Sequence, residues 1–245
     1  MKLIDSHFHL NLLAADWLPC NGLFGGLAVT TGTADWQTTR YRLAGLSGFW
    51  RYALGVHPWF ADMSVDWMLF ESLLGQDAQC AIGEVGLDGS QGRPTWSVQQ
   101  SIFVRQLGYS REYQRLLSLH LVNDGERGYQ LIRAMQGLPG GIVHAFNGSL
   151  VQAQRWQGLG FHIGIGPRLL NRLSAKHLHM LRALDLSQIH LETDAPNDNA
   201  PYYVYSPNDL GPYLKQLSQV LECSADSLSN QLYDNWCRLW SFNGE

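Results

Sequence analysis

Three polar side chains occupy alternate positions in the opening run I-D-S-H-F-H. Asp5, His7 and His9 come directly after the apolar pair Leu3 and Ile4. Side chains of a β-strand repeat with a period of two, so these three would share one face of a strand. Imidazole and carboxylate groups are ligands of divalent metal ions. The opening run therefore indicates a strand with a metal-capable face.

Later apolar runs end in side chains of the same kind. Those residues are Glu84 in the run 79–85, His120 in 116–122, His144 in 140–146 and Asp194 in 189–194. Each one alone could be a capping or hydrogen-bonding residue. Together, at corresponding strand ends, they favour one site for two divalent ions, with a carboxylate such as Glu84 between them. Two such ions activate water and stabilise the attacking and leaving oxygens of a phosphodiester.

The elements that must position these side chains are eight short runs suited to buried parallel strands. They span residues 3–5, 26–31, 51–56, 79–85, 116–122, 140–146, 160–166 and 189–194. Stretches with helical spacing lie between several of them, for example Val98, Ile102, Phe103 and Leu107. Alternating strands and helices predict a parallel sheet, either a (β/α)8 TIM barrel or a doubly wound sheet.

We expect the barrel, as a single domain over residues 1–245, because no Pro/Gly/Ser-rich linker divides the chain. The connections 9–24 and 32–50 are short for a barrel. The first βα units are therefore expected to be distorted or shortened. Residues 211–241 read as one or two closing helices.

Composition favours a folded enzyme without a broad nucleic-acid footprint. Hydrophobic residues make up 45% and charged residues 16% of the chain, which allows a large core. The formal net charge of −4 argues against wide contact with duplex DNA. No secretion signal or long apolar run is apparent, so a cytoplasmic protein without membrane contact is expected.

Several stretches resemble the TatD-type metal-dependent deoxyribonucleases of the amidohydrolase superfamily. The resemblance runs over nearly the whole chain and keeps the family's order of motifs. The matching stretches are IDSHFHL at the start, GVHP at 55–58, AIGEVGLD at 81–88, GIVHAFNGS at 141–149 and LETDAP at 191–196.

The resemblance implies a role for each candidate ligand. His7 and His9 would bind one metal with Asp194 close by, and His120 and His144 would bind the second metal. Glu84 would bridge the two ions, whose identity (Mg²⁺, Mn²⁺ or Zn²⁺) the sequence leaves open. Asp194 would also orient or deprotonate the attacking water.

The resemblance also implies residues around the ligands. His57 and Glu192 would contact the phosphate or sugar of a substrate at the mouth, and Trp59 would face the same mouth. Asp5 would hold a metal-bound imidazole by its free N–H group. The expected substrate is DNA, as single strands or ends.

This chain departs from the family pattern at its substrate rim. The family usually has H-x-R after the fifth strand, whereas Val122 stands here in place of that arginine. A shortened member of this kind resembles the TatD-like components of Qat-type bacterial antiphage systems. That likeness implies a role in antiviral defence, with protein partners from the same system.

Two other functions remain open from the sequence. The same metal set could hydrolyse an amide or lactone, or deaminate a small molecule, because barrel metal sites support several hydrolyses. Alternatively, the chain could be a binding subunit that keeps metal for structure and acts through partners. A substrate panel separates the first alternative from a nuclease, and co-purification without turnover would support the second.

Overall fold

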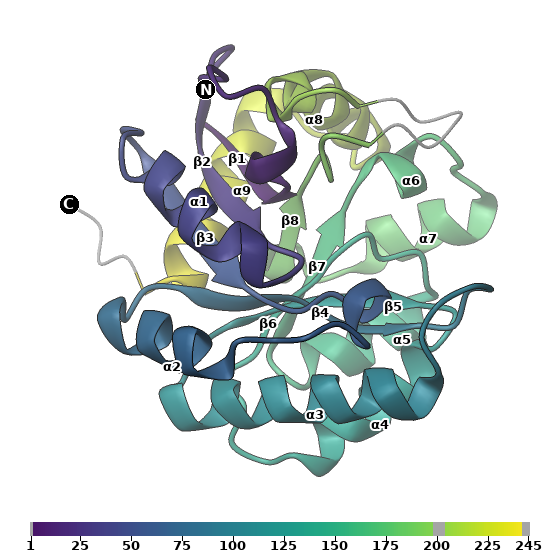
Figure 1. Cartoon of the computed structure of the whole chain (residues 1–245). Coiled ribbons are helices and arrows are strands. Elements are labelled where there is room, and N and C mark those ends of the chain that lie inside the picture. Colours follow the sequence, from purple (N-terminus) through teal and green to yellow (C-terminus); the bar gives the residue numbers. More distant parts are fainter. Residues whose placement is uncertain (1, 198–203, 242–245) are drawn as a thin grey trace.

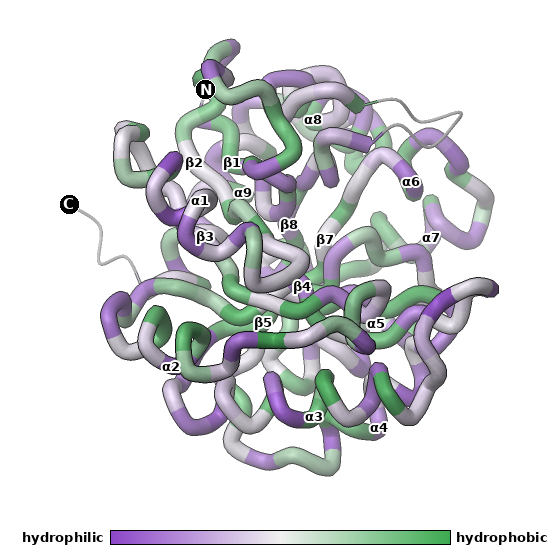
Figure 2. Tube along the Cα trace, in the orientation of Figure 1, coloured by the Kyte–Doolittle hydropathy of each residue, from purple (hydrophilic) through white to green (hydrophobic). Residues whose placement is uncertain are grey.

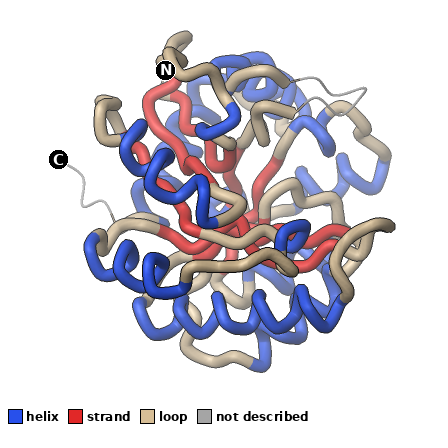
Figure 3. Tube along the Cα trace, in the orientation of Figure 1, coloured by secondary structure: helices blue, strands red, loops and turns tan. Residues whose placement is uncertain are grey.

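Eight parallel strands form one sheet in the computed structural model, which describes residues 2–197 and 204–241 (Figures 1 and 3). The strands are β1 (Leu3–Phe8), β2 (Leu23–Val29), β3 (Phe49–Leu54), β4 (Ala81–Asp88), β5 (Leu117–Val122), β6 (Gly141–Val143), β7 (Phe161–Ile165) and β8 (Ile189–Leu191). Each strand pairs in parallel with the next one along the chain. The predicted strand runs are confirmed, with ends that differ by a few residues.

Backbone hydrogen bonds join β1 to the segment that follows β8. The His9 N–H donates to the Ala195 carbonyl at 2.7 Å, and the Asp194 N–H donates to the His7 carbonyl at 2.9 Å. An open, doubly wound sheet has no such link between its first and last strands. The sheet is therefore a nearly closed TIM barrel, as predicted.

Helices surround the strands (Figure 3). They are α1 (Thr33–Leu43), α2 (Trp67–Gln76), α3 (Trp96–Tyr113), α4 (Gly125–Ala134), α5 (Leu150–Gln157), α6 (Pro167–Leu170), α7 (Ala175–Ala183), α8 (Leu210–Val220) and α9 (Ala225–Leu239). Short 3-10 turns are η1 (Leu10–Leu12), η2 (Pro58–Phe60), η3 (Leu186–Gln188) and η4 (Pro207–Asp209). No helix of the described residues is long and apolar enough to cross a membrane.

The first βα unit is shortened, as expected, and the second is not. Only the turn η1 lies between β1 and β2, whereas α1 fills the connection from β2 to β3 with 11 helical residues. Trp36 of α1 is fully buried, and its indole N–H donates to the Gly55 carbonyl at 3.0 Å. A short connection still holds a full helix here because that helix is anchored against the end of β3.

The core has two faces because successive strand side chains point in opposite directions. The neighbours Leu3 and Ile4 are both buried but belong to different apolar clusters. Ile4 packs in the cluster that contains Trp236 of α9, and Leu3 packs in the cluster that contains Phe103 of α3. Figure 2 shows the hydrophobic strands at the centre and more hydrophilic segments outside. The strands are thus held on both faces, which fixes the positions of their carboxyl ends.

Candidate metal centre

The structure brings the six predicted ligands together at the carboxyl ends of the strands. They are His7 and His9 at the end of β1, Glu84 in β4, His120 in β5, His144 directly after β6, and Asp194 after β8. Active sites of TIM barrels lie on this face. The convergence of these side chains follows from the closed barrel.

Glu84 stands between two groups of histidines. Its Oε2 lies 3.5 Å from the Nε2 atoms of both His7 and His9. Its Oε1 lies 2.5 Å from His120 Nδ1 and 2.8 Å from His144 Nε2. The two oxygens of one carboxylate thus face different ligand groups, which is the arrangement that a bridging carboxylate needs.

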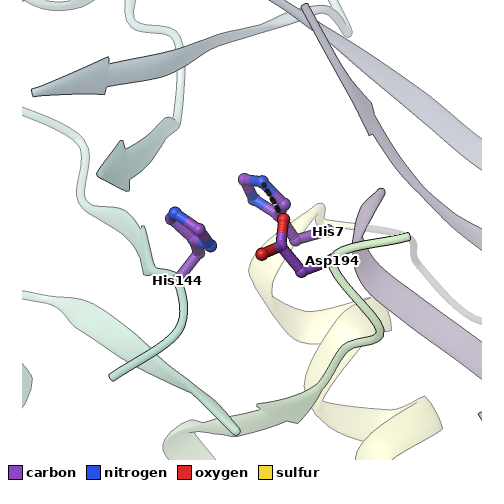
Figure 4. Close-up of side chains that lie close together, drawn as sticks. All are labelled: His7, His144 and Asp194. Carbon is purple, nitrogen blue, oxygen red and sulfur yellow. Dashed lines mark ion pairs between the residues drawn. The ribbon is translucent and has the colours of Figure 1, made fainter. Parts of the chain in front are cut away.

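Asp194, in the segment after β8 beside β1, completes the first group. Its Oδ1 lies 3.7 Å from His7 Nε2 and 3.5 Å from His9 Nε2. Figure 4 shows His7, His144 and Asp194 side by side, and the rings of His7 and His144 stack with centroids 3.8 Å apart. The Asp194 side chain is placed there because its own backbone N–H is bonded to the His7 carbonyl.

The first group has the spacing of ligands around an ion. His7 Nε2 is buried and has no hydrogen-bond partner among the described residues. Its separations of 3.5 and 3.7 Å from Glu84 and Asp194 exceed ordinary hydrogen bonds of about 2.7–3.2 Å. Two ligand atoms each about 2.1 Å from a tetrahedral ion stand roughly 3.4 Å apart. These residues therefore fit a divalent metal ion.

A second set with metal-ligand spacing lies on the other side of Glu84. One ligand atom each from His57, Glu84 and His120 fall within 4.8 Å of one another, as do those of His7, His9 and Glu84. His120 and His144 touch Glu84 directly, so an ion bound there would replace hydrogen bonds. The donor set on both sides suits Zn²⁺ or Mn²⁺.

Contacts behind the imidazoles orient their rings. His7 Nδ1 lies 3.1 Å from Ser118 Oγ, and His57 Nδ1 accepts the Trp59 backbone N–H at 3.2 Å. Both rings direct Nε2 at Glu84: in His57 this nitrogen carries the proton because Nδ1 accepts, whereas in His7 it is free for a metal when Nδ1 donates to Ser118. Partners of this kind fix the ring orientation of metal-bound histidines.

The electrostatics of the site favour an ionised pair of carboxylates. Burial opposes ionisation of Glu84, but the charges of His57 and the neighbouring histidines outweigh it and hold its pKa well below the usual range. For Asp194, burial is likewise outweighed, chiefly by its hydrogen bond with His9, and its pKa falls to about 2. Burial lowers the pKa of His57 to about 4, whereas at His120 and His144 burial is outweighed, chiefly by the attraction to Glu84, and the pKa of both rings is raised. Metal ions bind ionised carboxylates and neutral imidazoles, so an ion bound here would displace the protons that Glu84 favours on His120 and His144.

Asp5 does not hold an imidazole, so that expectation is wrong. Its fully buried carboxylate accepts the backbone N–H groups of His7 and Thr193, at 3.1 and 3.0 Å, and the Thr193 hydroxyl. The Asp5 side chain lies where β1 meets the segment after β8. Its carboxylate therefore accepts hydrogen bonds from backbone N–H groups of both segments and not from an imidazole. Asp5 therefore positions His7 through the main chain.

His57 and Glu192 lie deeper than the mouth where substrate contacts were expected. His57 is only 4% exposed and lies 3.5 Å from Glu84 Oε1, within a possible ligand group. Glu192 is 0% exposed and accepts the Ala145 N–H and the Ser6 hydroxyl. Glu192 is buried because Gly164 of β7 has no side chain: a Cβ there would stand 2.3 Å from its Oε2.

Trp59 lies at the mouth, as expected, and is held by a residue that the sequence reasoning missed. It is 38% exposed, and its indole N–H donates to Asp88 Oδ2 at 2.6 Å. The same Asp88 oxygen lies 3.3 Å from His120 Nε2. Asp88 is the last residue of β4, four positions after Glu84, and an even spacing puts both side chains on the same face of the strand. That spacing is the sequence pattern from which Asp88 could have been predicted as a site residue.

A cleft of about 640 Å³ opens above these residues. Trp59, Arg93, Val122, Arg168 and Arg172 contribute to its wall. The position where the family arginine would stand thus faces the cleft but carries Val122. The positive charge at the cleft comes instead from Arg93 in the β4–α3 loop, Arg168 in α6 and Arg172 after α6.

A TIM barrel with histidines and carboxylates gathered around a shared glutamate defines a metal-dependent hydrolase. The family model described as TatD related DNase matches residues 4–241. The chain belongs to this family.

Individual proteins resemble the chain over most of its length. An uncharacterized metal-dependent hydrolase of Haemophilus influenzae is 24% identical over 264 residues, covering 98% of this chain and 100% of that protein. The Klebsiella pneumoniae protein named 3'-5' ssDNA/RNA exonuclease TatD is 29% identical over 182 residues, which cover 71% and 68% of the two chains. The crystal structure of YjjV, a TatD homologue from Escherichia coli, matches with a TM-score of 0.80 and 26% identity over 98% of each chain.

Proposed function

We propose that this chain hydrolyses phosphodiester bonds of DNA as an exonuclease on single strands or strand ends, using two divalent ions. The observation that carries the proposal is the position of Glu84, whose two oxygens face separate histidine groups. Relatives named as 3'-5' exonucleases of single-stranded DNA and RNA support the choice of substrate. Mg²⁺, Mn²⁺ and Zn²⁺ are the candidate ions.

The ligand residues divide around Glu84. His7, His9 and Asp194 would hold one ion, and His120 and His144 the other, with Glu84 shared. His144 also has a ligand atom within 4.8 Å of those of His7 and Asp194, so it lies between the two positions. A metal pair of this kind activates water and stabilises the oxygens of a phosphodiester during displacement. His57 is assigned to neither ion, because its Nδ1 accepts the Trp59 N–H and its Nε2 therefore carries the proton.

Asp194 is the residue we assign to the attacking water. Its side chain is 24% exposed, whereas that of Glu84 is 3% exposed, so Asp194 reaches the cleft more openly. Its Oδ2 accepts from the Asn197 amide at 3.2 Å, which holds the carboxylate in place. A carboxylate with a pKa of about 2 is a weak base, so it orients the water first and takes the proton as the O–H bond breaks.

The rim suits a strand end better than a duplex. The chain carries a net charge of −4, but Arg93, Arg168 and Arg172 line the cleft. A local group of arginines beside a metal centre can bind a few phosphates without a wide basic surface. Trp59 offers a partly exposed ring for a base, with the Arg93 guanidinium 3.4 Å from its centroid. A cytoplasmic location, a single domain over 1–245 and partners from a defence system stay predictions.

Cleavage of end-labelled DNA tests the proposal. Mn²⁺-loaded protein should shorten single strands from one end, and a chelator should stop the reaction. Asp194→Ala and His120→Ala should abolish cleavage with little change in thermal unfolding, while His179→Ala, at an exposed position on α7, should cleave normally. The nuclease assignment is wrong if metal-loaded protein leaves every DNA and RNA end intact.

A small-molecule hydrolase is the second candidate. The cleft volume of about 640 Å³ lies within the roughly 300–1,000 Å³ of small-molecule sites, and Val122 replaces a phosphate-binding charge. A panel of amides, lactones and aminopyrimidines separates the two functions. Turnover of any panel member, together with intact DNA ends, would favour this candidate.

A further inference from the structure

A second, smaller cavity of about 220 Å³ lies directly beside the cleft. Val122, His144, Ala145 and Arg168 line both cavities and so form their common wall. His144 is at the same time a candidate metal ligand, 2.8 Å from Glu84. Whatever occupies the smaller cavity therefore lies next to the group bound at the metal centre.

Aromatic, amide-bearing and charged residues together form the wall of the smaller cavity. Its lining residues include the aromatic Tyr129, Phe146 and Trp156 and the amide-bearing Asn147. The Arg155 guanidinium lies 3.9 Å over the Tyr129 ring, and Phe146 and Trp156 are buried. Flat heterocycles with hydrogen-bonding edges are recognised by this combination of rings and amides. The volume is below the roughly 300–1,000 Å³ of drug-sized sites, which suits a single base.

Charge inside the smaller cavity is neutralised at its rim. Arg155 binds Glu126 through two contacts, Nη1 to Oε2 at 2.9 Å and Nη2 to Oε1 at 3.0 Å. A bidentate pair of this kind leaves neither charge for a ligand. The cavity therefore suits an uncharged ring better than a phosphate.

Arg168 differs from that pair. It lies on α6 at the wall shared by the two cavities, is exposed, and forms no ion pair within residues 2–197 and 204–241. A guanidinium at this junction can bind the phosphate of a ligand that has one part in the cleft and another in the smaller cavity.

We propose that the smaller cavity binds one nucleobase of a single strand, next to the nucleotide at the metal centre, and that Arg168 binds the phosphate between them. The proposal rests on the nucleic-acid substrate proposed above and adds a specific subsite to it. Val122 is the residue that keeps the subsite open to the cleft, because its short side chain forms part of the wall between them.

Binding of short single strands that each carry one abasic site tests the subsite. Fluorescence anisotropy is measured with the chelated protein, so that the strands stay intact. In the wild type, an abasic site at one position should weaken binding about tenfold, the effect of losing one stacked base. Val122→Phe, which fills the shared wall, should bind the intact strand and that abasic strand equally.

Two further variants separate the roles of the wall and of the charge. Asn147→Ala, at an exposed position, should reduce the abasic penalty about threefold through the loss of a hydrogen bond. Arg168→Gln should weaken every strand about equally and keep the penalty at the same position. Val151→Phe adds the same aromatic group on exposed α5, outside both cavity walls, and should behave as the wild type.

The outcomes distinguish the subsite from the nuclease. A position-specific penalty that Val122→Phe removes supports the subsite even if no strand is cleaved when metal is restored. A penalty that persists in Val122→Phe and in Asn147→Ala, or the absence of a penalty at every position, overturns the subsite even if the protein is a nuclease.

Discussion

The contact between Asp88 and His120 leads to a prediction about metal affinity. Asp88 Oδ2 lies 3.3 Å from His120 Nε2, while His120 Nδ1 faces Glu84. Asp88→Asn keeps the shape of the side chain and removes its charge. Without the negative charge, the acceptor that holds the Nε2 proton of the imidazole and directs Nδ1 to the metal side is weaker.

The magnitude follows from the geometry of that contact. A hydrogen bond to a charged group contributes about 1.5–3 kcal/mol. The separation of 3.3 Å is longer than the roughly 2.7–2.9 Å of strong charge-assisted bonds, which places this contact at the lower end. A loss of about 1.5 kcal/mol corresponds to about tenfold weaker metal binding.

Calorimetric titration of the chelator-stripped protein with Mn²⁺ or Zn²⁺ measures this effect. Asp88→Asn should bind the ion near His120 about tenfold more weakly than the wild type. Asp66→Asn is the matched control, because Asp66 caps α2 by accepting the Leu69 N–H and takes no part in the metal centre. Unchanged metal affinity in Asp88→Asn would refute the assignment of His120 as a ligand held by Asp88.

Two other predictions concern stability. Gly164→Ala should lower the free energy of unfolding, measured in urea, by about 1–3 kcal/mol, because the new Cβ would stand 2.3 Å from Glu192 Oε2. Gly75→Ala in α2 is the control: no atom lies near its Cβ, and it should raise the free energy of unfolding by about 0.4–1 kcal/mol. The buried pair His162 and His190, with Nδ1 and Nε2 2.9 Å apart, should make the protein less stable as the pH falls from 7 to 5.

The sign of the pH effect follows from the depressed pKa values. Burial, reinforced by the charge of Arg238, lowers the pKa of His162 to about 4, and burial lowers that of His190 well below its usual range. Unfolded histidine titrates near pH 6.5, so only the unfolded state gains protons between about pH 6.5 and 4. His162 alone should account for about 2 kcal/mol lost between pH 7 and 5.

A matched comparison isolates that contribution from other titrating groups. The double variant His162→Gln/His190→Gln should lose at least about 2 kcal/mol less stability than the wild type between pH 7 and 5 in urea unfolding. His179→Gln, at an exposed position, should keep the wild-type dependence. An equal dependence in the wild type and the double variant would contradict neutral burial of the pair.

Residues that end an apolar strand run could be predicted from the sequence. His120 and Asp194 carry their signal locally, since a polar, metal-capable side chain closes a buried run. The parallel order of the strands then dictates that such ends converge. The barrel and the place of its candidate ligands could therefore be predicted without any knowledge of individual contacts.

Partners that depend on side-chain depth could not be predicted in this way. Asp5 shares a strand face with His7, yet the backbone of Thr193, which is 188 positions away, reaches its carboxylate. Asp88 contacts Trp59 and His120 from two other strand ends. The hydrogen-bond partners of Asp5 and Asp88 depend on how segments far apart in the sequence pack together, and a local sequence pattern does not predict that packing.

The shared position of Glu84 is the central claim, and the number of bound ions tests it most directly. Native mass spectrometry of Mn²⁺-loaded protein should find two ions per wild-type chain, and Glu84→Gln, which keeps the side-chain shape, should weaken the binding of both. Thermal unfolding of the metal-free variant controls for folding. Two ions held by Glu84→Gln as tightly as by the wild type would contradict a glutamate shared between two metals.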